Sequence, residues 1–263
     1  MTEPATVGPS GRDLWVGTSW KMTKTLDQAR RYARGLADHL GPEAPPGVQP
    51  FVVPPFTALD AVRHELGPGS PVVLGAQNAH WAPEGAWTGE ISVLQAEDAG
   101  ARLVEIGHSE RREHFGETDE TVRRKVAAVL ERGLVPLLCV GESEQVKQAG
   151  GSTDHVLGQV ARALDGLGEA DLARVLIAYE PIWAIGEHGR PATVEELAEP
   201  FAALDREHGA GVLGLLYGGS VDVGNAPELL GIAGVTGLFV GRAAWELDGY
   251  VQLLEIASRV AEG

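Results

Sequence analysis

Short apolar runs alternate with amphipathic segments along nearly the whole chain. Runs of about four to eight apolar residues are typical of buried strands, and the amphipathic stretches between them are typical of helices that connect parallel strands. We predict strands over residues 14–20, 50–53, 72–76, 103–106, 135–140, 175–179, 213–217 and 238–240. The pattern therefore indicates eight pairs of one strand and one helix.

The clearest helical patterns cover residues 119–131 and 193–207. In the second, Thr193 is a suitable N-cap and Glu196 completes a capping box. Eight such pairs close naturally into a (β/α)₈ TIM barrel, although an open, doubly wound sheet of about five to seven strands is an alternative. No linker or charge block divides the sequence, so we predict an α/β protein with a single domain over residues 1–263, in which residues 1–12 form a flexible leader.

The composition of the chain bears on its location in the cell and on the kinds of partner that it can bind. The formal net charge of −16 disfavours binding to nucleic acid or to anionic lipid. The single cysteine, Cys139, cannot form an internal disulfide, and residues 1–11 lack the pattern of a secretory signal. No apolar run approaches the roughly 20 residues that span a bilayer. We therefore expect a cytoplasmic protein that binds neither a membrane nor a nucleic acid.

Polar residues follow the predicted strands directly, at the end of a barrel that holds its active site. They are Lys21 after the first strand, Gln77 and Asn78 after the third, His108 and Glu110 after the fourth, Glu180 after the sixth, and Gly218, Gly219 and Ser220 after the seventh. Because the carboxyl ends of parallel strands meet at one end of a barrel, we expect these residues to face one cavity.

Two of these residues have the chemistry of a proton-transfer site. Glu180 precedes an apolar loop, and a carboxylate that such a loop covers is tuned toward a general base. His108 precedes a predicted helix, where a neutral imidazole could polarise a carbonyl. Taken alone, Glu180 could equally be an N-cap or surface carboxylate, and His108 a satisfied core or surface histidine.

Charged and glycine-rich positions suggest how a phosphorylated substrate could be bound. Lys21 supplies a cation for substrate oxygens, and Glu110 could position it by ion pairing, unless Glu110 pairs with the neighbouring Arg111 or Arg112. Glycines also follow the last two predicted strands, where many barrels bind phosphate through backbone amides. They are Gly218 and Gly219 before Ser220, and Gly241 before Arg242, although such glycines alone often serve only in turns. The sequence has no Walker lysine motif, dinucleotide fingerprint or Cys/His metal spacing, so we predict neither a cofactor nor a metal.

Six motifs in this order resemble the triosephosphate isomerase family over residues 14–257. They are Trp20-Lys21-Met22, Gly75-Ala76-Gln77-Asn78, Thr88-Gly89-Glu90-Ile91-Ser92, Gly107-His108-Ser109-Glu110-Arg111-Arg112, Tyr179-Glu180-Pro181-Ile182-Trp183-Ala184-Ile185-Gly186 and Tyr217-Gly218-Gly219-Ser220-Val221. So many ordered matches are not expected by chance. The chain is accordingly identified from its sequence as similar to this family.

The resemblance implies a role for each matched residue. Glu180 would abstract a proton beside a carbonyl to give an enediolate, while His108 and Lys21, the latter held by Glu110, would stabilise its oxygens. The loop over residues 181–192 would close on the intermediate. Phosphate would be bound by backbone amides of Gly186, Ser220, Gly241 and Arg242. The segment from Gln77 to Glu90 would form a homodimer, and the substrate would be a phosphorylated sugar of three or four carbons.

Three departures from the family pattern bear on the substrate. Ser19 replaces the usual substrate-contacting asparagine, Arg242 replaces the second glycine after the last strand, and the loop after Gly186 is about one residue longer and contains His188. Together with Gly85-Ala86-Trp87-Thr88, they resemble the L-erythrulose-1-phosphate isomerases of this family. Their four-carbon substrate needs more room at the reacting end, which the shorter side chain of Ser19 would supply.

Other functions remain open from the sequence. An ordinary triosephosphate isomerase would use the same base and electrophile, with the departures as neutral changes. A non-catalytic barrel that binds a phosphorylated ligand is the main alternative that is not an enzyme, because a fold does not imply an activity. An aldolase-type barrel would need a Schiff-base lysine, for which Lys21 is the candidate.

Overall fold

A computed structural model describes residues 13–186 and 189–263 of the chain. The predicted leader over residues 1–12 and His188 lie outside the described residues. The eight strands are β1 (Leu14–Ser19), β2 (Val48–Val53), β3 (Val73–Ala76), β4 (Leu103–Ile106), β5 (Val135–Val140), β6 (Leu176–Tyr179), β7 (Gly214–Gly219) and β8 (Gly237–Val240). All neighbours pair in parallel, and β8 pairs with β1 to close the barrel. The predicted (β/α)₈ TIM barrel is confirmed, and the open sheet is wrong.

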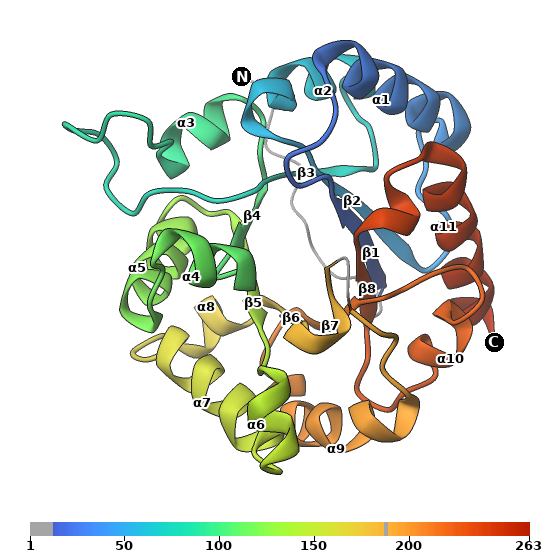
Figure 1. Cartoon of the computed structure of the whole chain (residues 1–263). Coiled ribbons are helices and arrows are strands. Elements are labelled where there is room, and N and C mark those ends of the chain that lie inside the picture. Colours follow the sequence, from blue (N-terminus) through green and yellow to red (C-terminus); the bar gives the residue numbers. More distant parts are fainter. Residues whose placement is uncertain (1–12, 187–188) are drawn as a thin grey trace.

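Helices surround the barrel, as Figure 1 shows. They are α1 (Leu26–Leu40), α2 (Leu59–Leu66), α3 (Val93–Asp98), α4 (Ser109–Phe115), α5 (Asp119–Glu131), α6 (Glu144–Gln148), α7 (Ser152–Ala163), α8 (Glu169–Leu172), α9 (Val194–Leu204), α10 (Ala226–Leu230) and α11 (Leu247–Glu262). Thr193 caps α9 and forms the predicted capping box with Glu196. The predicted continuation of this helix to residue 207 is wrong, because a π-helical turn over Asp205–Gly209 follows. That turn buries no residue, so no apolar stripe maintains the α-helical period.

Two apolar cores follow from the alternation of side chains along each strand. One fills the barrel interior and includes Trp15, Phe51, Leu103, Leu137 and Phe239. The other lies between the strands and the helices. Gly17 is needed inside the barrel because a Cβ atom there would lie 2.3 Å from the ring of Phe51. Inward positions at the carboxyl ends of the strands therefore form the floor of any cavity above this packed interior.

The long connection between β3 and α3 extends away from the barrel (Figure 1). Within it, the ring of His80 stacks against Trp81, and its centroid lies 4.3 Å from that of Trp87. This connection contains the segment from Gln77 to Glu90 that the sequence singled out. Within the described part of the chain, no helix is long and apolar enough to cross a membrane.

Candidate active site

Most residues predicted for the site line one cavity of about 610 Å³ at the carboxyl ends of the strands. They are Ser19, Lys21, His108, Glu110, Glu180, Gly186, Ser220, Gly241 and Arg242. Phe239 and Trp245 also line it. The prediction was wrong for Gln77 and Asn78, which do not line this cavity, because Gln77 binds the Lys21 carbonyl and Asn78 binds the Lys125 ammonium. The fold thus brings together side chains and backbone segments that lie up to about 220 residues apart, since Ser19 and Arg242 face the same space.

Glu180 follows β6 immediately, and the neighbouring strand β7 leaves room for its carboxylate. Its amide donates a hydrogen bond of 2.7 Å to the carbonyl of Val140. A Cβ atom on Gly218 would lie 2.5 Å from the Oε1 atom of Glu180, so glycine is required there. The side chain is buried, and its Oε2 atom has no hydrogen-bond partner among the described residues. A buried carboxylate oxygen without a partner is well suited to accept a proton from a bound ligand.

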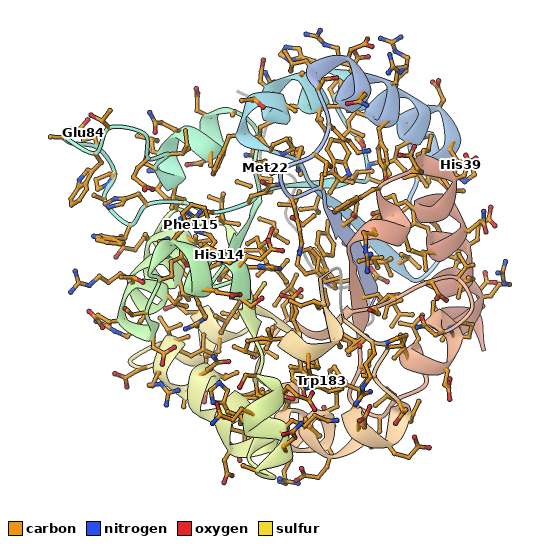
Figure 2. All side chains as sticks on the ribbon, in the orientation of Figure 1. Met22, His39, Glu84, His114, Phe115 and Trp183 are labelled. Carbon is orange, nitrogen blue, oxygen red and sulfur yellow. The ribbon has the colours of Figure 1, made fainter. Side chains whose placement is uncertain are left out.

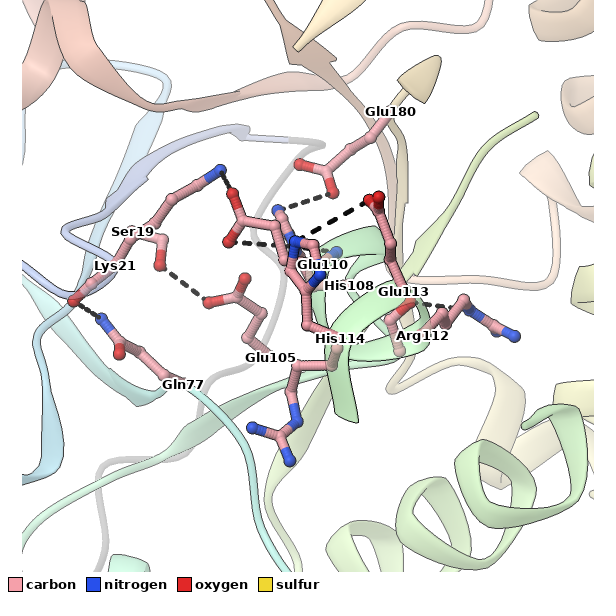
Figure 3. A network of polar contacts seen from close by, with 12 residues as sticks. Ser19, Lys21, Gln77, Glu105, His108, Glu110, Arg112, Glu113, His114 and Glu180 are labelled. Atoms are coloured by element: carbon pink, nitrogen blue, oxygen red, sulfur yellow. Dashed lines mark hydrogen bonds and ion pairs between the residues drawn. The ribbon is translucent and has the colours of Figure 1, made fainter. Parts of the chain in front are cut away.

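His108 is the N-cap of α4 and faces Glu180. Its Nδ1 atom accepts a hydrogen bond of 3.2 Å from the amide of Glu110. Because Nδ1 uses its lone pair in this contact, the neutral ring carries its hydrogen on Nε2. That Nε2 atom lies 3.6 Å from Oε2 of Glu180 (Figure 3). A carboxylate that can accept a proton and an imidazole that can donate a hydrogen bond thus face the same small volume.

Lys21 has left-handed backbone geometry, with a φ of 49°. For a residue other than glycine this conformation costs free energy, and the surrounding contacts must hold it in place. The Gln77 amide supplies one such contact by donating 2.8 Å to the Lys21 carbonyl. The Lys21 ammonium lies 2.6 Å from a carboxylate oxygen of Glu110 (Figure 3). The backbone contact and the ion pair together direct the lysine side chain along the cavity wall.

The ion pair between Lys21 and Glu110 keeps both groups charged. Burial by itself would lower the pKa of Lys21, but its hydrogen bond to Glu110 and the nearby negative charges of Glu110, Glu180 and Glu105 raise that pKa. Burial likewise opposes ionisation of Glu110, yet the hydrogen bond from Lys21 and the positive charge of Lys21 lower the pKa of Glu110. The site therefore contains a fixed cation despite the strongly negative net charge of the protein.

The alternative partners that the sequence left open for Glu110 bind elsewhere. Arg111 forms its ion pair with Glu117. Arg112 contacts Asp119 at 2.7 Å. The predicted pairing of Glu110 with Lys21 is the one that the structure contains.

Backbone segments from three loops face the opposite part of the cavity. Gly186 lies in the loop after β6, Ser220 follows β7, and Gly241 follows β8. Arg242 comes directly after Gly241 and also lines the cavity. The Ser220 hydroxyl donates to the Ala184 carbonyl at 2.8 Å, which ties the loop after β7 to the loop after β6. This part of the cavity has the composition of an anion site, with glycine backbone and one guanidinium group.

Comparison with known proteins supports what the geometry suggests. The profile of the family described as triosephosphate isomerase matches residues 14–257. The chain belongs to the triosephosphate isomerase family. Within this family, it is 66% identical over 245 residues to the L-erythrulose-1-phosphate isomerase of Mycolicibacterium smegmatis, covering 93% of each chain. It is 50% identical to the protein of the same name from Mesorhizobium japonicum, covering 93% of this chain and 97% of the relative. A Brucella abortus protein of that name is 48% identical, covering 92% of this chain and 95% of the relative.

The resemblance predicted from the motifs, including its subgroup, is therefore confirmed. The relatives are named as isomerases, so the prediction of an enzyme of this type agrees with the comparisons. Among the described residues, no group of three or more His, Cys, Asp or Glu side chains is arranged to hold a metal ion.

Two buried carboxylates near this site were missed from the sequence. Glu142 accepts hydrogen bonds from Ser152, Tyr179 and Trp183 on one oxygen, with 2.8 Å to the Trp183 indole. It thereby holds the start of the loop over residues 181–192. Glu105 lies inside the barrel and accepts a hydrogen bond of 2.9 Å from the Ser19 hydroxyl (Figure 3). A charged residue within the apolar run 103–106 was the available signal for Glu105.

Proposed function

We propose that this protein interconverts L-erythrulose 1-phosphate and D-erythrulose 4-phosphate through an enediolate, without a cofactor. The observation that carries the proposal is the unpaired Glu180 carboxylate oxygen 3.6 Å from the Nε2 atom of His108. The shared name of the similar proteins supports the four-carbon substrate, and so does the short Ser19 side chain in the cavity wall.

The proposed reaction moves one hydrogen from C3 to C2 and one from O3 to O2, and it breaks no carbon–carbon bond. Glu180 takes the proton from C3 of L-erythrulose 1-phosphate, and the electron pair of that bond forms the C2–C3 double bond while the C2 carbonyl oxygen becomes negative. The Nε2–H group of His108 and the ammonium of Lys21 stabilise that oxygen. Glu180 then returns its proton to C2, and the hydrogen of the O3 hydroxyl passes by way of His108 to the C2 oxygen, which gives the isomeric ketone with its carbonyl at C3.

Phosphate binding is assigned to the loops after β6, β7 and β8. Backbone amides of Gly186, Ser220 and Gly241 and the Arg242 guanidinium line that part of the cavity. Together with Lys21 they supply positive potential at short range, where a net charge of −16 spread over the protein is largely screened. Closure of the loop over residues 181–192 would exclude water and suppress elimination of phosphate from the enediolate.

A homodimer formed through the segment from Gln77 to Glu90 is part of the proposal. This segment stands out from the barrel, and its Trp87 is half exposed. Met22, next to the catalytic lysine in sequence, is 98% exposed, and Phe115 is also exposed. In Figure 2, Glu84 lies at the far end of this segment, Phe115 lies between the segment and the centre of the molecule, and Met22 lies nearer the mouth of the barrel. Large exposed apolar side chains beside a projecting loop favour association of two copies.

We also infer a cytoplasmic location. The one cysteine, Cys139, is a buried free thiol inside the barrel. A free thiol agrees with a reducing compartment.

The test is kcat/KM on L-erythrulose 1-phosphate and on dihydroxyacetone phosphate in parallel, with Glu180→Gln as the blank. We expect the four-carbon ketose to be favoured by about tenfold or more, equivalent to roughly 1.4 kcal/mol in transition-state binding. Preference for the triose would instead identify an ordinary triosephosphate isomerase. Binding of either ligand without turnover would identify a non-catalytic barrel, and a borohydride-trapped adduct on Lys21 would indicate aldolase chemistry.

A further inference from the structure

A carboxylate lies in the packed interior of the barrel at a position where apolar side chains are expected. Glu105 is on β4, two residues after Leu103, and shares the inward direction of that leucine. Its neighbour across the β4–β5 pairing is Leu137, another residue of the interior core. The side chain is only 4% exposed. A buried carboxylate costs free energy unless its surroundings compensate for it.

No residue in the described part of the chain forms an ion pair with Glu105. Its one hydrogen bond within the described residues is the contact of 2.9 Å from the Ser19 hydroxyl. Burial raises its pKa to about 7, and the neighbouring Glu180 adds to this effect, while His108, Ser19 and Lys21 only partly offset it. A purely structural role would favour an apolar residue here, as at the equivalent inward positions of the other strands. The position therefore indicates a functional use of the Ser19–Glu105 contact.

The contact determines which way the Ser19 hydroxyl faces the substrate. A serine hydroxyl has one hydrogen to donate and two lone pairs that accept. Ser19 donates its hydrogen to Oε2 of Glu105, away from the cavity that Ser19 itself lines. Toward the cavity the oxygen then presents only lone pairs. A ligand atom beside Ser19 must therefore be a hydrogen-bond donor, such as a hydroxyl group, and a phosphate or carbonyl oxygen is disfavoured.

We propose that Glu105 is a positioning residue that fixes Ser19 as the acceptor for the terminal hydroxyl group of a four-carbon ketose phosphate. Figure 3 shows Ser19 beside Lys21, on the side of the cavity where the Lys21 ammonium meets Glu110, and we therefore assign Ser19 to the reacting end of the substrate. The terminal CH₂OH group is the part by which this substrate exceeds a triose phosphate. The inference rests on the proposed function and names the contact through which the extra group is recognised.

The test compares L-erythrulose 1-phosphate with its 4-deoxy analogue, in which CH₃ replaces the terminal CH₂OH. We expect wild-type protein to prefer the hydroxylated ketose in kcat/KM by about tenfold to a hundredfold, the range of one hydrogen bond in a closed site. Ser19→Ala and Glu105→Leu should both reduce this preference for the hydroxylated ketose to within about threefold. The double variant should lose no more than either single variant, because both remove one interaction.

Two further variants separate recognition from folding. Thr18→Val removes the buried hydroxyl next to Ser19 on the opposite face of β1, which has no hydrogen-bond partner among the described residues, and should keep the full preference. Glu105→Gln keeps an oxygen that can accept from Ser19, and should restore most of the preference lost in Glu105→Leu.

The outcomes distinguish this inference from the proposed function. If wild-type protein does not isomerise L-erythrulose 1-phosphate, the proposed function is wrong and the inference falls with it. If it turns over the ketose and the 4-deoxy analogue equally well, or if Ser19→Ala keeps the preference, the function stands and the inference is overturned.

Discussion

The guanidinium of Arg242 donates a hydrogen bond of 3.0 Å to the backbone carbonyl of Gly186. This contact joins the loop after β8 to the middle of the loop over residues 181–192, in the part of the cavity assigned to phosphate. Arg242 is exposed on its outer side, so the guanidinium has donors left for a second acceptor.

Replacing Arg242 by alanine should raise KM for the phosphorylated substrate about tenfold with a smaller change in kcat, because a charge-assisted hydrogen bond to phosphate is lost. Steady-state kinetics at low and high salt would measure this, and the difference from wild type should shrink as salt screens the charge. Arg259→Ala, on the distant helix α11, is the matched control. An unchanged KM would mean that Arg242 serves only the loop contact.

Glu180→Gln should lower kcat by about a thousandfold and leave KM within a few-fold, since the amide keeps the shape but cannot take a proton. Thermal unfolding should be nearly unchanged or slightly higher, because a buried carboxylate without a hydrogen bond on Oε2 is removed. Retention of more than a tenth of wild-type kcat would show that another group is the base.

How far the sequence could predict the site is clearest at Glu110. The motif placed this carboxylate after β4, but Lys21, Arg111 and Arg112 were all available to pair with it. Only the folded chain shows that each arginine has its own carboxylate partner, which leaves Glu110 to Lys21. Strand order and the residues after each strand were predictable because they depend on local apolar patterns. Pairing across 89 residues depends on the closure of the barrel.

The inward direction of the Glu105 side chain is a second feature that the sequence could not predict. The strand over residues 103–106 was predicted, but whether its third residue faces inward depends on the register of the barrel. The bounds of this strand were predicted correctly, but the bounds of a strand do not say which of its two faces points inward, and a register shift of one residue reverses the direction of every side chain. A charged residue in a short strand therefore could not be assigned to the interior from the sequence alone.

Stability should depend on pH through Glu105. Its pKa is raised from 4.5 to about 7 in the folded protein, mainly by burial. A raised carboxyl pKa means that the folded state binds the proton more tightly than the unfolded state, so this group lowers stability progressively as pH rises from about 4.5 to 7. Above about pH 7 the ionised Glu105 lowers the free energy of unfolding by its full amount. That amount is on the order of 3 kcal/mol at most, since one pKa unit is worth ~1.4 kcal/mol.

Glu105→Gln should accordingly raise the free energy of unfolding at pH 8 by up to that amount and change it much less at pH 5. Urea unfolding at the two pH values measures the difference. An equal effect at both values would mean that the charge of Glu105 is not the cause.

Trp87→Glu should convert the proposed homodimer into a monomer, because it places a charge on a half-exposed aromatic ring of the projecting segment. Sedimentation velocity over a range of protein concentrations would detect the change. Val260→Glu, which charges an exposed apolar residue on α11, is the control and should leave the assembly intact. A wild-type protein that sediments as a monomer at all concentrations would rule out the dimer.

The contact between Ser19 and Glu105 also constrains the order in which these two residues could arise during evolution. A barrel with Glu105 but no hydroxyl at position 19 would hold a buried carboxylate without its donor, at a substantial cost in stability. A barrel with Ser19 and an apolar side chain at position 105 has only a hydroxyl at the cavity wall, where water can satisfy it. The order that costs less stability therefore acquires Ser19 before Glu105. An ancestor with Ser19 alone would have accepted the larger substrate before it could select that substrate by its terminal hydroxyl group.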